Sequence, residues 1–551
     1  MTDTLAIALA QMDPTVGDVA GNARRILDMR AEAGRQGADL AVFGELAITG
    51  YPPDDLILKG AFQRAVEAQV AELAQATRDG GPALLIGAPW LAVDHLYNAA
   101  LLLDGGDIAA IRFKHELPNY GVFDEVRLFA PGPLPEPIAF RGMNLGVMIC
   151  EDMWKPAVVD HLGAAGADLL AVLNGSPFEA GKGDTRLGVA RERQAAVPRP
   201  LVYVNLVGGQ DELVFDGGSF ALSADGTPVA RLDTWTEEVA LTRWRREVRG
   251  WTCVEAPLAP EPAPLENIYR AVMTGLKDYV GKNRFKGVLI GLSGGIDSAL
   301  VAALAVDALG ADKVHCVMMP SRYTSRESLE DAAEVARLLG IRLDTIGIEP
   351  AVGAFGGMLE SIFAGQAPDT TEENIQARAR GLTLMAISNK FGLMVISTGN
   401  KSEMSVGYAT LYGDMCGGFA ALKDLYKTTV FALSRWRNAH RPKGALGPGG
   451  PVMPDRVIVK PPTAELKANQ TDQDSLPPYD VLDDILECLI EDEMSQAEIV
   501  GRGHDPETVR RVWRLVDGAE YKRRQAPPGV KITRRSFGRD RRYPITNAFR
   551  G

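Results

Sequence analysis

Cys150 is the residue of this chain whose type and setting most clearly indicate chemistry. It ends the apolar run Leu145–Cys150, and the acidic residue Glu151 follows it. A thiol becomes a nucleophile when a nearby cation or base favours its thiolate form. Glu45 and Lys114 have suitable types for base and cation, although their positions along the chain say nothing about contact. Taken alone, a free cysteine is more often a small buried hydrophobe.

A second segment, Gly291–Ser298, has the composition of a phosphate-binding loop. It reads Gly-Leu-Ser-Gly-Gly-Ile-Asp-Ser and leads into a predicted helix, 297–309. Glycines let the backbone approach a phosphate closely, and a helix N-terminus presents unpaired N–H groups to it. Ser293 and Ser298 add hydroxyl donors, and Asp297 is placed to hold Mg²⁺ beside a polyphosphate. A Gly-Gly pair alone is ordinary helix capping, and the segment lacks the Gly-Lys-Ser/Thr ending of a Walker loop.

The elements around these residues alternate between strand and helix patterns. Candidate active residues fall at or just after strand ends, which is typical of layered α/β folds. The strands predicted in the first half are Leu5–Gln11, Leu40–Phe43, Ala83–Ala88, Leu145–Cys150, Leu169–Leu173 and Leu201–Leu206, and the helices are Asn22–Gln36 and Ala61–Arg78. In the second half we expect strands Gly287–Gly291, Lys313–Met319 and Met394–Ser397, and helices Glu266–Val280, Asp297–Leu309 and Ser325–Leu339.

The length of 551 residues predicts two domains. The Pro-rich stretch Ala256–Leu265 forbids helix and favours an extended linker. We therefore predict domains at 1–250 and 266–551, joined by a linker at 251–265. The Gly- and Pro-rich segment His440–Pro462 predicts a long loop, and its length suggests a lid or binding segment.

Composition excludes several classes of function. A net charge of -12 argues against a nucleic-acid partner. Five cysteines without paired spacing make neither a disulfide framework nor a zinc site, so a reducing compartment is expected. The N-terminal residues show no secretory signal, and apolar runs are too short to span a bilayer. We expect a cytoplasmic protein with no membrane partner.

The residues around the candidate thiol site resemble the Glu-Lys-Cys triad of the nitrilase superfamily. Glu45 lies in Phe-Gly-Glu-Leu-Ala-Ile-Thr-Gly-Tyr-Pro-Pro, Lys114 precedes Leu-Pro-Asn-Tyr-Gly-Val-Phe-Asp-Glu, and Cys150 lies in Ile-Cys-Glu-Asp. The resemblance spans roughly residues 3–245. It implies a four-layer α-β-β-α sandwich, attack of the thiolate on an amide or nitrile carbon, and hydrolysis of the acyl thioester with the glutamate as base.

The longer matches resemble the glutaminase domain of the glutamine-dependent NAD synthetase family. That resemblance implies that Tyr120, Glu151, Ser176 and Lys182 bind L-glutamine. Some relatives carry Arg where this chain has Lys182. The compact ammonium of Lys therefore replaces a planar guanidinium that could bind a carboxylate through two parallel hydrogen bonds. Tyr120 could instead be a packing aromatic, and Lys182 a solvated loop charge.

The phosphate loop resembles that of the PP-loop ATP pyrophosphatases, which cleave ATP to AMP and pyrophosphate while adenylating an acyl oxygen. This resemblance implies a C-terminal Rossmann-like parallel-sheet domain. The implied ATP-binding residues of the loop are Gly291, Leu292, Ser293, Gly294, Gly295, Ile296, Asp297 and Ser298.

Further segments of the second half resemble NAD synthetases over residues 266–551. The resemblance implies that Thr398 and Lys427 contact ATP, that Asn374, Glu403 and Lys522 contact deamido-NAD, and that Asp297 and Glu403 hold Mg²⁺. The segments that carry it are Met319–Ser325, Glu373–Arg378, Ser397–Glu403, Gly413–Asp414, Asp424–Lys427 and Pro462–Leu466.

Together the two resemblances imply that ammonia from glutamine amidates the adenylated carboxylate of deamido-NAD, in a chain that forms a homo-oligomer. Two alternatives remain open: amidation of another carboxylate, such as xanthylate or aspartate, and a nucleotide-binding scaffold with inactive sites. The C-terminal run Lys522–Arg542 holds nine Lys or Arg and one acid. It is compatible with a solvated surface, a subunit contact or a clamp for the dinucleotide's phosphates.

Overall fold

The computed structural model describes residues 3–468 and 470–549. It divides into two compact units, unit 1 (Met1–Ala263) and unit 2 (Pro264–Gly551), each considered by itself below. Within the described residues, the helices are all too short or too polar to cross a membrane.

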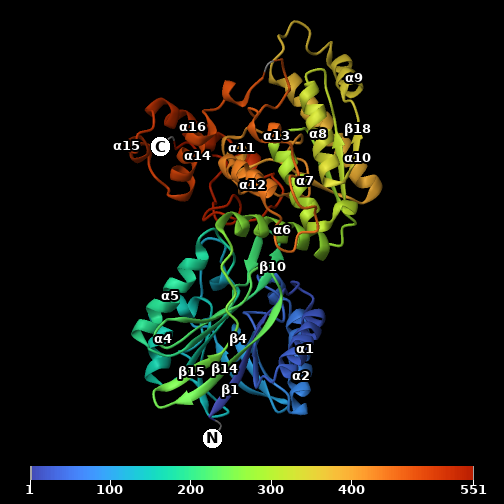
Figure 1. The fold of residues 1–551 in the computed structure, drawn as a ribbon. Helices are drawn as coiled ribbons and strands as arrows, with labels where there is room; N and C mark the ends of the chain where they lie inside the picture. Colours follow the sequence, from blue (N-terminus) through green and yellow to red (C-terminus); the bar gives the residue numbers. More distant parts are fainter. Residues whose placement is uncertain (1–2, 469, 550–551) are drawn as a thin grey trace. The chain divides into compact units, whose positions relative to one another are not determined.

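Unit 1 contains two sheets (Figure 1). The seven-stranded sheet has the order β15-β14-β1-β2-β3-β4-β5, and the six-stranded sheet the order β13-β12-β9-β8-β7-β6. The strands of the first are β1 (Thr4–Gln11), β2 (Leu40–Val42), β3 (Ala83–Ala92), β4 (His95–Asp104), β5 (Asp107–Phe113), β14 (Glu238–Glu247) and β15 (Gly250–Glu255). Those of the second are β6 (Ile138–Phe140), β7 (Met143–Ile149), β8 (Leu169–Asn174), β9 (Leu201–Asn205), β12 (Phe220–Leu222) and β13 (Pro228–Arg231), and a separate hairpin joins β10 (Val207–Gln210) to β11 (Leu213–Asp216).

Four layers form because both faces of each sheet are covered. On β1, Ile7 and Leu9 belong to the apolar cluster between the two sheets, whereas Ala8 and Ala10 belong to the cluster beneath the helices. Alternating side chains of a strand face opposite sides, so a strand buried on both faces reads as one apolar run. The helices of this unit are α1 (Val19–Arg35) and α2 (Gly60–Ala76) over the first sheet, and α3 (Glu151–Trp154), α4 (Pro156–Ala164) and α5 (Lys182–Ala196) on the second.

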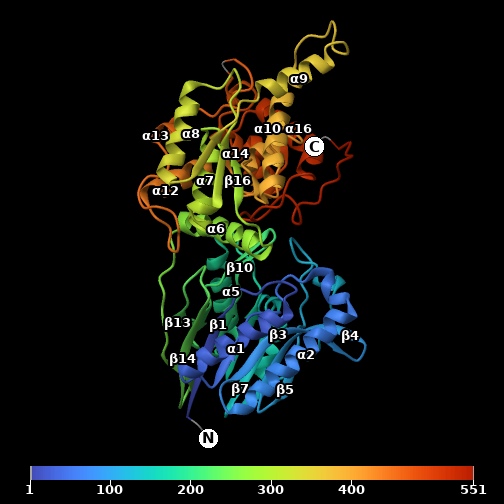
Figure 2. The same cartoon turned by 90° about the vertical axis from the view of Figure 1, so that its right-hand side faces the viewer.

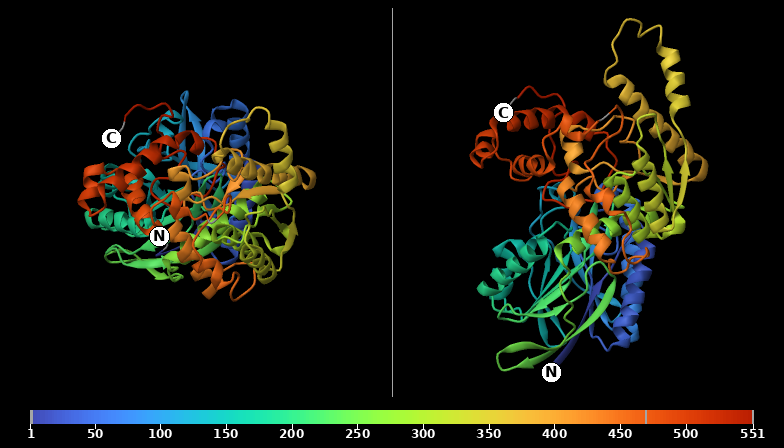
Figure 3. Two further views of the ribbon diagram at one scale, coloured as in Figure 1. Left: turned by 90° about the horizontal axis from the view of Figure 1, so that it is seen from above. Right: turned by 45° about the horizontal axis from the view of Figure 1, so that its top comes forward.

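Figure 3 shows the blue helices and the teal helices of unit 1 on opposite sides of the sheets. The predicted α-β-β-α sandwich is confirmed. The predicted strand ending at Cys150 is one residue too long, because β7 ends at Ile149 and Cys150 lies in the turn that follows. Residues 251–255, predicted as linker, instead belong to β15, which pairs with β14.

Unit 2 is built on a five-stranded sheet of order β18-β17-β16-β19-β20, in which every neighbouring pair is parallel. This confirms the predicted Rossmann-like domain. Helix α7 follows β16, and nearly all its residues are buried, so it is apolar on every side rather than amphipathic. The strands are β16 (Val288–Gly291), β17 (Val314–Met318), β18 (Arg342–Thr345), β19 (Met394–Ser397) and β20 (Phe419–Ala420).

Figure 2 shows β16 between α7 and α10, and α9 extending away from the sheet. The helices of unit 2 are α6 (Pro264–Lys282), α7 (Ile296–Leu309), α8 (Arg326–Leu339), α9 (Glu349–Leu359), α10 (Thr370–Phe391), α11 (Lys401–Val406), α12 (Lys427–Ala439), α13 (Asp455–Val459), α14 (Tyr479–Leu486), α15 (Gln496–Gly501), α16 (Pro506–Gly518) and α17 (Glu520–Arg523). A separate apolar cluster joins α11, α14, α15 and α16.

The segment predicted as a long loop, 440–462, contains the short helix α13 and is anchored from α12. The buried Arg437 guanidinium donates to the carbonyl oxygens of Pro448 at 2.7 Å and His440 at 3.2 Å, and pairs with Asp307. These bonds hold the first part of the segment against the domain.

Candidate active sites

Cys150 lies at a strained turn between β7 and α3. Its φ of 46° and ψ of -96° fall in a region that side chains other than glycine rarely adopt. The side chain is 4% exposed. Burial raises the pKa of the Cys150 thiol well above its ordinary value, Glu45 raises it further, and Lys114 opposes them. The thiol is therefore neutral at physiological pH and needs a base to release its proton.

Glu45 and Lys114, both fully buried, are brought into contact by the ends of β2 and β5. The Lys114 Nζ donates to the Glu45 Oε1 at 2.7 Å, and the other oxygen of Glu45 accepts from the backbone N of Gly175 at 3.0 Å. Burial lowers the pKa of Lys114, but Glu125 and Glu45 together raise it more, leaving it well above its ordinary value. Lys114 is therefore a fixed cation in the field of the thiol.

The residues predicted to bind glutamine lie around this centre in two groups. The Tyr120 hydroxyl donates to the Glu151 Oε2 at 2.8 Å, and the Phe123 ring lies 5.5 Å from the Tyr120 ring. Lys182, at the start of α5, places its ammonium 5.8 Å from the same Phe123 ring. Ser176 is separate from this group: it is buried, and its hydroxyl accepts from the Arg186 Nε at 3.1 Å.

The phosphate loop of unit 2 connects β16 to α7, and hydrogen bonds to the hydroxyl groups of Ser293 and Ser298 stabilise it. The Ser293 and Ser298 hydroxyl oxygens lie 3.1 Å apart, and the Gly295 N donates to the Ser293 Oγ at 3.2 Å. Gly294 has a φ of 78°, and a Cβ there would lie 2.3 Å from the Ser328 carbonyl oxygen. Only glycine fits at this position, because both the backbone conformation and the space exclude a side chain.

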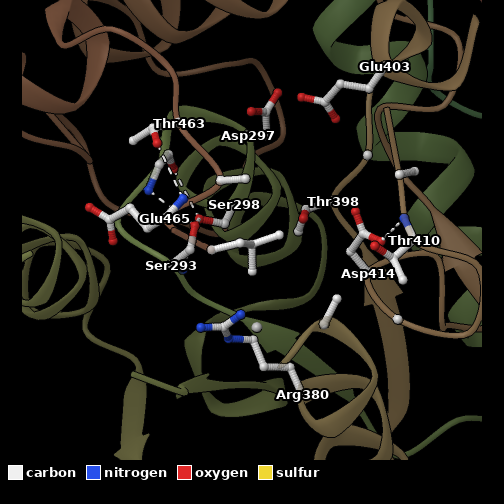
Figure 4. Close-up of a pocket in the computed structure, with 18 of the residues that line it drawn as sticks. Ser293, Asp297, Ser298, Arg380, Thr398, Glu403, Thr410, Asp414, Thr463 and Glu465 are labelled. Atoms are coloured by element: carbon white, nitrogen blue, oxygen red, sulfur yellow. Dashed lines mark hydrogen bonds between the residues drawn. The ribbon is translucent and has the colours of Figure 1, made fainter. Parts of the chain in front are cut away.

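A cavity of about 550 Å³ opens at the carboxyl ends of β16, β17 and β19. Its size falls within the range of small-molecule sites, about 300–1,000 Å³. Figure 4 shows the loop residues on one side and Thr398 and Glu403 on the other. Of the predicted unit 2 site residues, all except Gly294 line this cavity: Gly291, Leu292, Ser293, Gly295, Ile296, Asp297, Ser298, Asn374, Thr398, Glu403, Lys427 and Lys522.

Two carboxylates of the cavity wall pair with one ammonium. The Lys427 Nζ lies 2.5 Å from the Asp297 Oδ2 and 3.3 Å from the Glu403 Oε1. Asn400, which caps α11, donates to the other oxygen of Asp297 at 2.9 Å. Burial raises the pKa of Glu403 to about 8, with Lys427 opposing and Asp297 adding to the effect. A cation bound here would relieve the repulsion between the carboxylates.

Asn374 and Lys522 lie at another part of the cavity wall. The Asn374 Oδ1 accepts from the Thr410 hydroxyl at 2.9 Å. The Lys522 Nζ donates to the carbonyl oxygens of Gly407 at 2.7 Å and Ala409 at 2.6 Å. Burial lowers the pKa of Lys522, and the carbonyl oxygens hold its ammonium at a fixed place beside the cavity.

The remaining basic residues of the C-terminal run are largely engaged within unit 2. Within the described part of the run, Lys522 alone lines the cavity. Arg541 lies 2.8 Å from Glu520, Lys531 lies 2.8 Å from Asp540, and Arg534 lies 2.5 Å from an Asp492 oxygen. Most of the run therefore holds the domain together instead of forming a phosphate clamp.

Comparison with known proteins assigns both halves of the chain. A carbon–nitrogen hydrolase model matches residues 6–251, and an NAD synthase model matches residues 268–526. The glutamine-dependent NAD(+) synthetase of Rhodobacter capsulatus is 51% identical over 551 residues, which cover 100% of both chains. The chain belongs to the glutamine-dependent NAD(+) synthetases. The family member from Xanthomonas campestris is 49% identical, over 100% of this chain and 98% of its own.

Solved structures agree with this membership. A glutamine-dependent NAD+ synthetase from Acinetobacter baumannii, in complex with adenosine diphosphate, is 42% identical, covers 98% of each chain and has a TM-score of 0.79. A family member from Cytophaga hutchinsonii, at 23% identity and a TM-score of 0.82, shows the same fold. As a glutamine-dependent NAD(+) synthetase, the chain is a carbon–nitrogen ligase. Membership also decides against amidation of another carboxylate and against an inactive scaffold.

Three residues that contact the predicted triad or line the cavity were missed by the sequence analysis. Both oxygens of Glu125 accept from the Lys114 Nζ, at 2.9 and 2.8 Å, and Asn98 donates to the Glu45 Oε1 at 2.7 Å. Glu125 ends the motif after Lys114, which was its only signal. Arg380, on α10, points into the cavity of unit 2 (Figure 4).

Proposed function

We propose that ammonia is made from L-glutamine in unit 1 and used in unit 2 to convert deamido-NAD to NAD, with ATP cleaved to AMP and pyrophosphate. The observation that carries this division is that each unit holds its own complete set of reactive groups. Unit 1 has a buried thiol with Glu45 and Lys114, and unit 2 has a phosphate loop in a large cavity.

In unit 1, Glu45 takes the proton of the neutral Cys150 thiol as the sulfur attacks the carboxamide carbon of glutamine. Lys114 stays protonated and stabilises the negative charge of the tetrahedral intermediate. Glu45 returns the proton to the departing nitrogen, which leaves as ammonia. Glu45 then takes a proton from water as the water oxygen attacks the thioester carbon. It passes that proton to the departing Cys150 sulfur, which gives glutamate, the free thiol and the ionised Glu45.

The glutamine substrate carries an α-ammonium and an α-carboxylate, and the side chains grouped around Tyr120 and Phe123 include the opposite charges, Glu151 and Lys182. Glu151 directly follows Cys150 and is buried beside the Tyr120 hydroxyl. Lys182 presents its ammonium across the Phe123 ring. We assign Glu151 and Tyr120 to the α-ammonium end and Lys182 to the α-carboxylate, with Ser176 contacting the substrate from the end of β8.

In unit 2, an oxygen of the nicotinate carboxylate attacks the α-phosphorus of ATP and pyrophosphate leaves. Ammonia then adds to the carboxyl carbon of the adenylate, AMP leaves, and a proton is lost. Ser293, Ser298 and the N–H groups at the start of α7 donate to phosphate oxygens. Lys427 and Thr398 contact ATP from the opposite wall, and Lys522 joins Asn374 and Glu403 in binding deamido-NAD.

Asp297 and Glu403 would hold Mg²⁺ in this cavity. Both carboxylates line it, and burial, with a smaller contribution from Asp297, raises the pKa of Glu403 to about 8 although Lys427 opposes the shift. Two carboxylates suit Mg²⁺, which takes its other ligands from water and substrate phosphates. Bound there, the ion would neutralise charge on the polyphosphate.

Arg380 extends the set of phosphate-binding groups. Its Nε donates to the Met319 carbonyl oxygen at 3.0 Å, and no carboxylate of the described residues pairs with its guanidinium. Burial lowers the pKa of Arg380, since its charge is only partly compensated. A phosphate oxygen of ATP would complete that compensation with a charge-assisted bond.

The proposal includes a homo-oligomer in the cytoplasm. Met358 and Ile362, in and just after α9, are each 72% exposed, and α9 has no buried residue. Ala351 and Val352 of α9 pack on an apolar cluster of unit 2, whereas Met358 and Ile362 stay exposed. A second copy would cover these exposed side chains, and light scattering would then give a multiple of 59.2 kDa. All five cysteines are free, which suits the reducing cytoplasm.

A substrate panel tests the proposed reaction. The purified enzyme is given ATP, Mg²⁺ and glutamine with deamido-NAD, xanthylate or aspartate, and AMP and amide product are measured. We expect product from deamido-NAD alone. AMP formation with xanthylate or aspartate and none with deamido-NAD would overturn the substrate assignment.

A further inference from the structure

The Asp152 carboxylate connects the two segments that carry Lys114 and Cys150. Its Oδ1 accepts from the backbone N of His115 at 3.0 Å and of Glu116 at 2.8 Å. Its Oδ2 accepts from the backbone N of Ile149 at 3.0 Å. One side chain therefore bonds to the residue after Lys114 and to the residue before Cys150.

These three bonds join loops that follow different sheets of unit 1. Lys114 follows β5 of the seven-stranded sheet, and Cys150 follows β7 of the six-stranded sheet. No strand of one sheet pairs with a strand of the other. A backbone bond from the Glu45 N to the Asn174 carbonyl oxygen at 3.2 Å links the sheets beside Glu45, but it reaches neither Lys114 nor Cys150 directly. The distance between ammonium and sulfur must be set by other contacts, and Asp152 supplies a polar one on the backbone of each segment.

The same carboxylate supports the strained turn at Cys150. Its bond to the Ile149 N closes a loop around the residue whose φ is 46°. A backbone held in a sparsely populated region persists only where its surroundings over-determine it. The Cys150 N–H donates to the Leu173 carbonyl oxygen at 2.9 Å, and the Met153 N–H donates to the Cys150 carbonyl oxygen at 3.0 Å, so both polar backbone groups of the turn are also satisfied.

We propose that Asp152 is the positioning residue of the glutaminase site: it sets the placement of Cys150 relative to Lys114 without touching substrate. The inference rests on the triad function proposed above. Asp152 is 1% exposed. Burial raises the pKa of Asp152 to about 6, while the N–H donors and Lys114 favour the charged form, so the carboxylate is ionised at neutral pH.

Asp152→Asn and Asp152→Ala test this role in the full-length enzyme. Asn keeps one acceptor oxygen but turns an N–H₂ group toward one set of backbone N–H groups, whereas Ala removes every bond. We expect the kcat for glutamine hydrolysis to fall about tenfold in Asp152→Asn, the loss of one bond to a charged group. In Asp152→Ala the fall should reach about 10²-fold, as for a reacting group displaced by about 1 Å.

A positioning role makes three further demands. The KM for glutamine should stay unchanged, because its contacts lie elsewhere. NAD synthesis with added ammonium should match wild type in both variants. Asp168→Asn is the matched control, since the Asp168 Oδ2 accepts from the Asn144 N at 2.8 Å at the opposite end of β7. That variant should keep the wild-type kcat.

Each alternative outcome has a defined meaning. Wild-type kcat in both Asp152 variants, a rise in KM at constant kcat, or an equal loss in Asp168→Asn would overturn the proposal. If Asp152→Ala fails to fold, the kcat and KM of Asp152→Asn decide alone. Absence of glutamine hydrolysis in the wild type would instead refute the proposed function of the triad.

Discussion

The two active sites of this enzyme differ in how complete they are before substrate arrives. In unit 1, Glu45 and Lys114 are fully buried and already bonded at 2.7 Å, with Cys150 beside them at 4% exposure. In unit 2 the reactive groups line a cavity of about 550 Å³, and Lys427 occupies the two carboxylates assigned to Mg²⁺. The glutaminase site is preorganised, whereas in the proposed reaction the synthetase site would exchange internal ion pairs for contacts with ligands.

The difference suits the two reactions. Glutamine hydrolysis develops charge at one carbon, and fixed groups in a dry site stabilise that charge without reorganising. The synthetase must admit two large polyanions, and by the proposal above their phosphates and Mg²⁺ would replace the internal partners of Lys427 and Asp297. Substitutions in unit 1 should therefore disrupt contacts among Glu45, Lys114 and Cys150 that exist before substrate binds. Substitutions in unit 2 should weaken the binding or activation of ligands.

Lys114→Met should cause the largest loss of activity among the variants considered, and it should affect only the reaction of unit 1. Glu45 and Glu125 would be left buried without their cation, which costs about 3–5 kcal/mol for a broken buried pair. We expect glutamine-dependent synthesis to fall about 10³-fold, the size of losing one preorganised charge. Steady-state rates with glutamine and with ammonium check this, together with thermal unfolding of unit 1. Undiminished glutamine turnover would refute the role of Lys114.

Asp297→Asn is the counterpart in unit 2. The substitution removes a single carboxylate, which is both a partner of the Lys427 ammonium and a proposed ligand of Mg²⁺. We expect NAD synthesis to fall about 10²–10³-fold with either nitrogen donor, while glutamine hydrolysis in unit 1 continues. A Mg²⁺ titration of the residual activity should show a raised requirement. Loss with glutamine alone would contradict the assignment.

Glu45→Gln tests how the charge of Glu45 affects the pKa of the Cys150 thiol. Glu45 raises the pKa of the Cys150 thiol and Lys114 lowers it, so removing the glutamate charge should lower that pKa and favour the thiolate. Turnover of glutamine should cease because the base is gone. Alkylation of Cys150 by iodoacetamide at neutral pH should nevertheless become faster, by about tenfold for a shift of one pKa unit. Cys150→Ala gives the labelling background, and slower alkylation would contradict the assigned sign.

Arg380→Ala should have the smallest effect. One charge-assisted bond to a phosphate is lost from many contacts, so the KM for ATP should rise about tenfold. The KM for glutamine should not change. Arg378→Ala is a suitable control, because Arg378 is exposed, lies on the same helix, and donates to the Leu411 carbonyl oxygen. An equal rise in both variants would show that Arg380 has no specific role.

The sequence predicted several elements that are apolar on both faces, but it missed the inner strand β4, although Asn98–Leu103 are all buried. Strand β1 and helix α7 are continuous apolar runs, and the run itself identifies them. The edge elements β5, β13 and β15 were missed, since their half-exposed residues form no such run. Pairing with neighbours distant in the chain makes them strands, and local pattern carries no record of that pairing.

The sequence likewise predicted some features of the candidate sites and not others. Glu45, Lys114 and Cys150 were found through the motifs around them, and the loop from Gly291 to Ser298 through its glycines. Contact between Glu45 and Lys114 was implied by the resemblance alone and could not be derived from their spacing, because 69 residues separate them. The strained φ of Cys150 was likewise hidden, as was the bridging role of Asp152, because both depend on how two sheets meet. A single sequence records residue types, whereas these functions depend on tertiary distances.

The most direct test of the division between the units uses Cys150→Ala. NAD formation from deamido-NAD and ATP-Mg²⁺ is measured with glutamine or ammonium as donor, in the variant and in the wild type. We predict that the variant loses glutamine-driven synthesis and keeps the wild-type rate with ammonium. Equal loss with both donors, or retained synthesis from glutamine, would contradict the account.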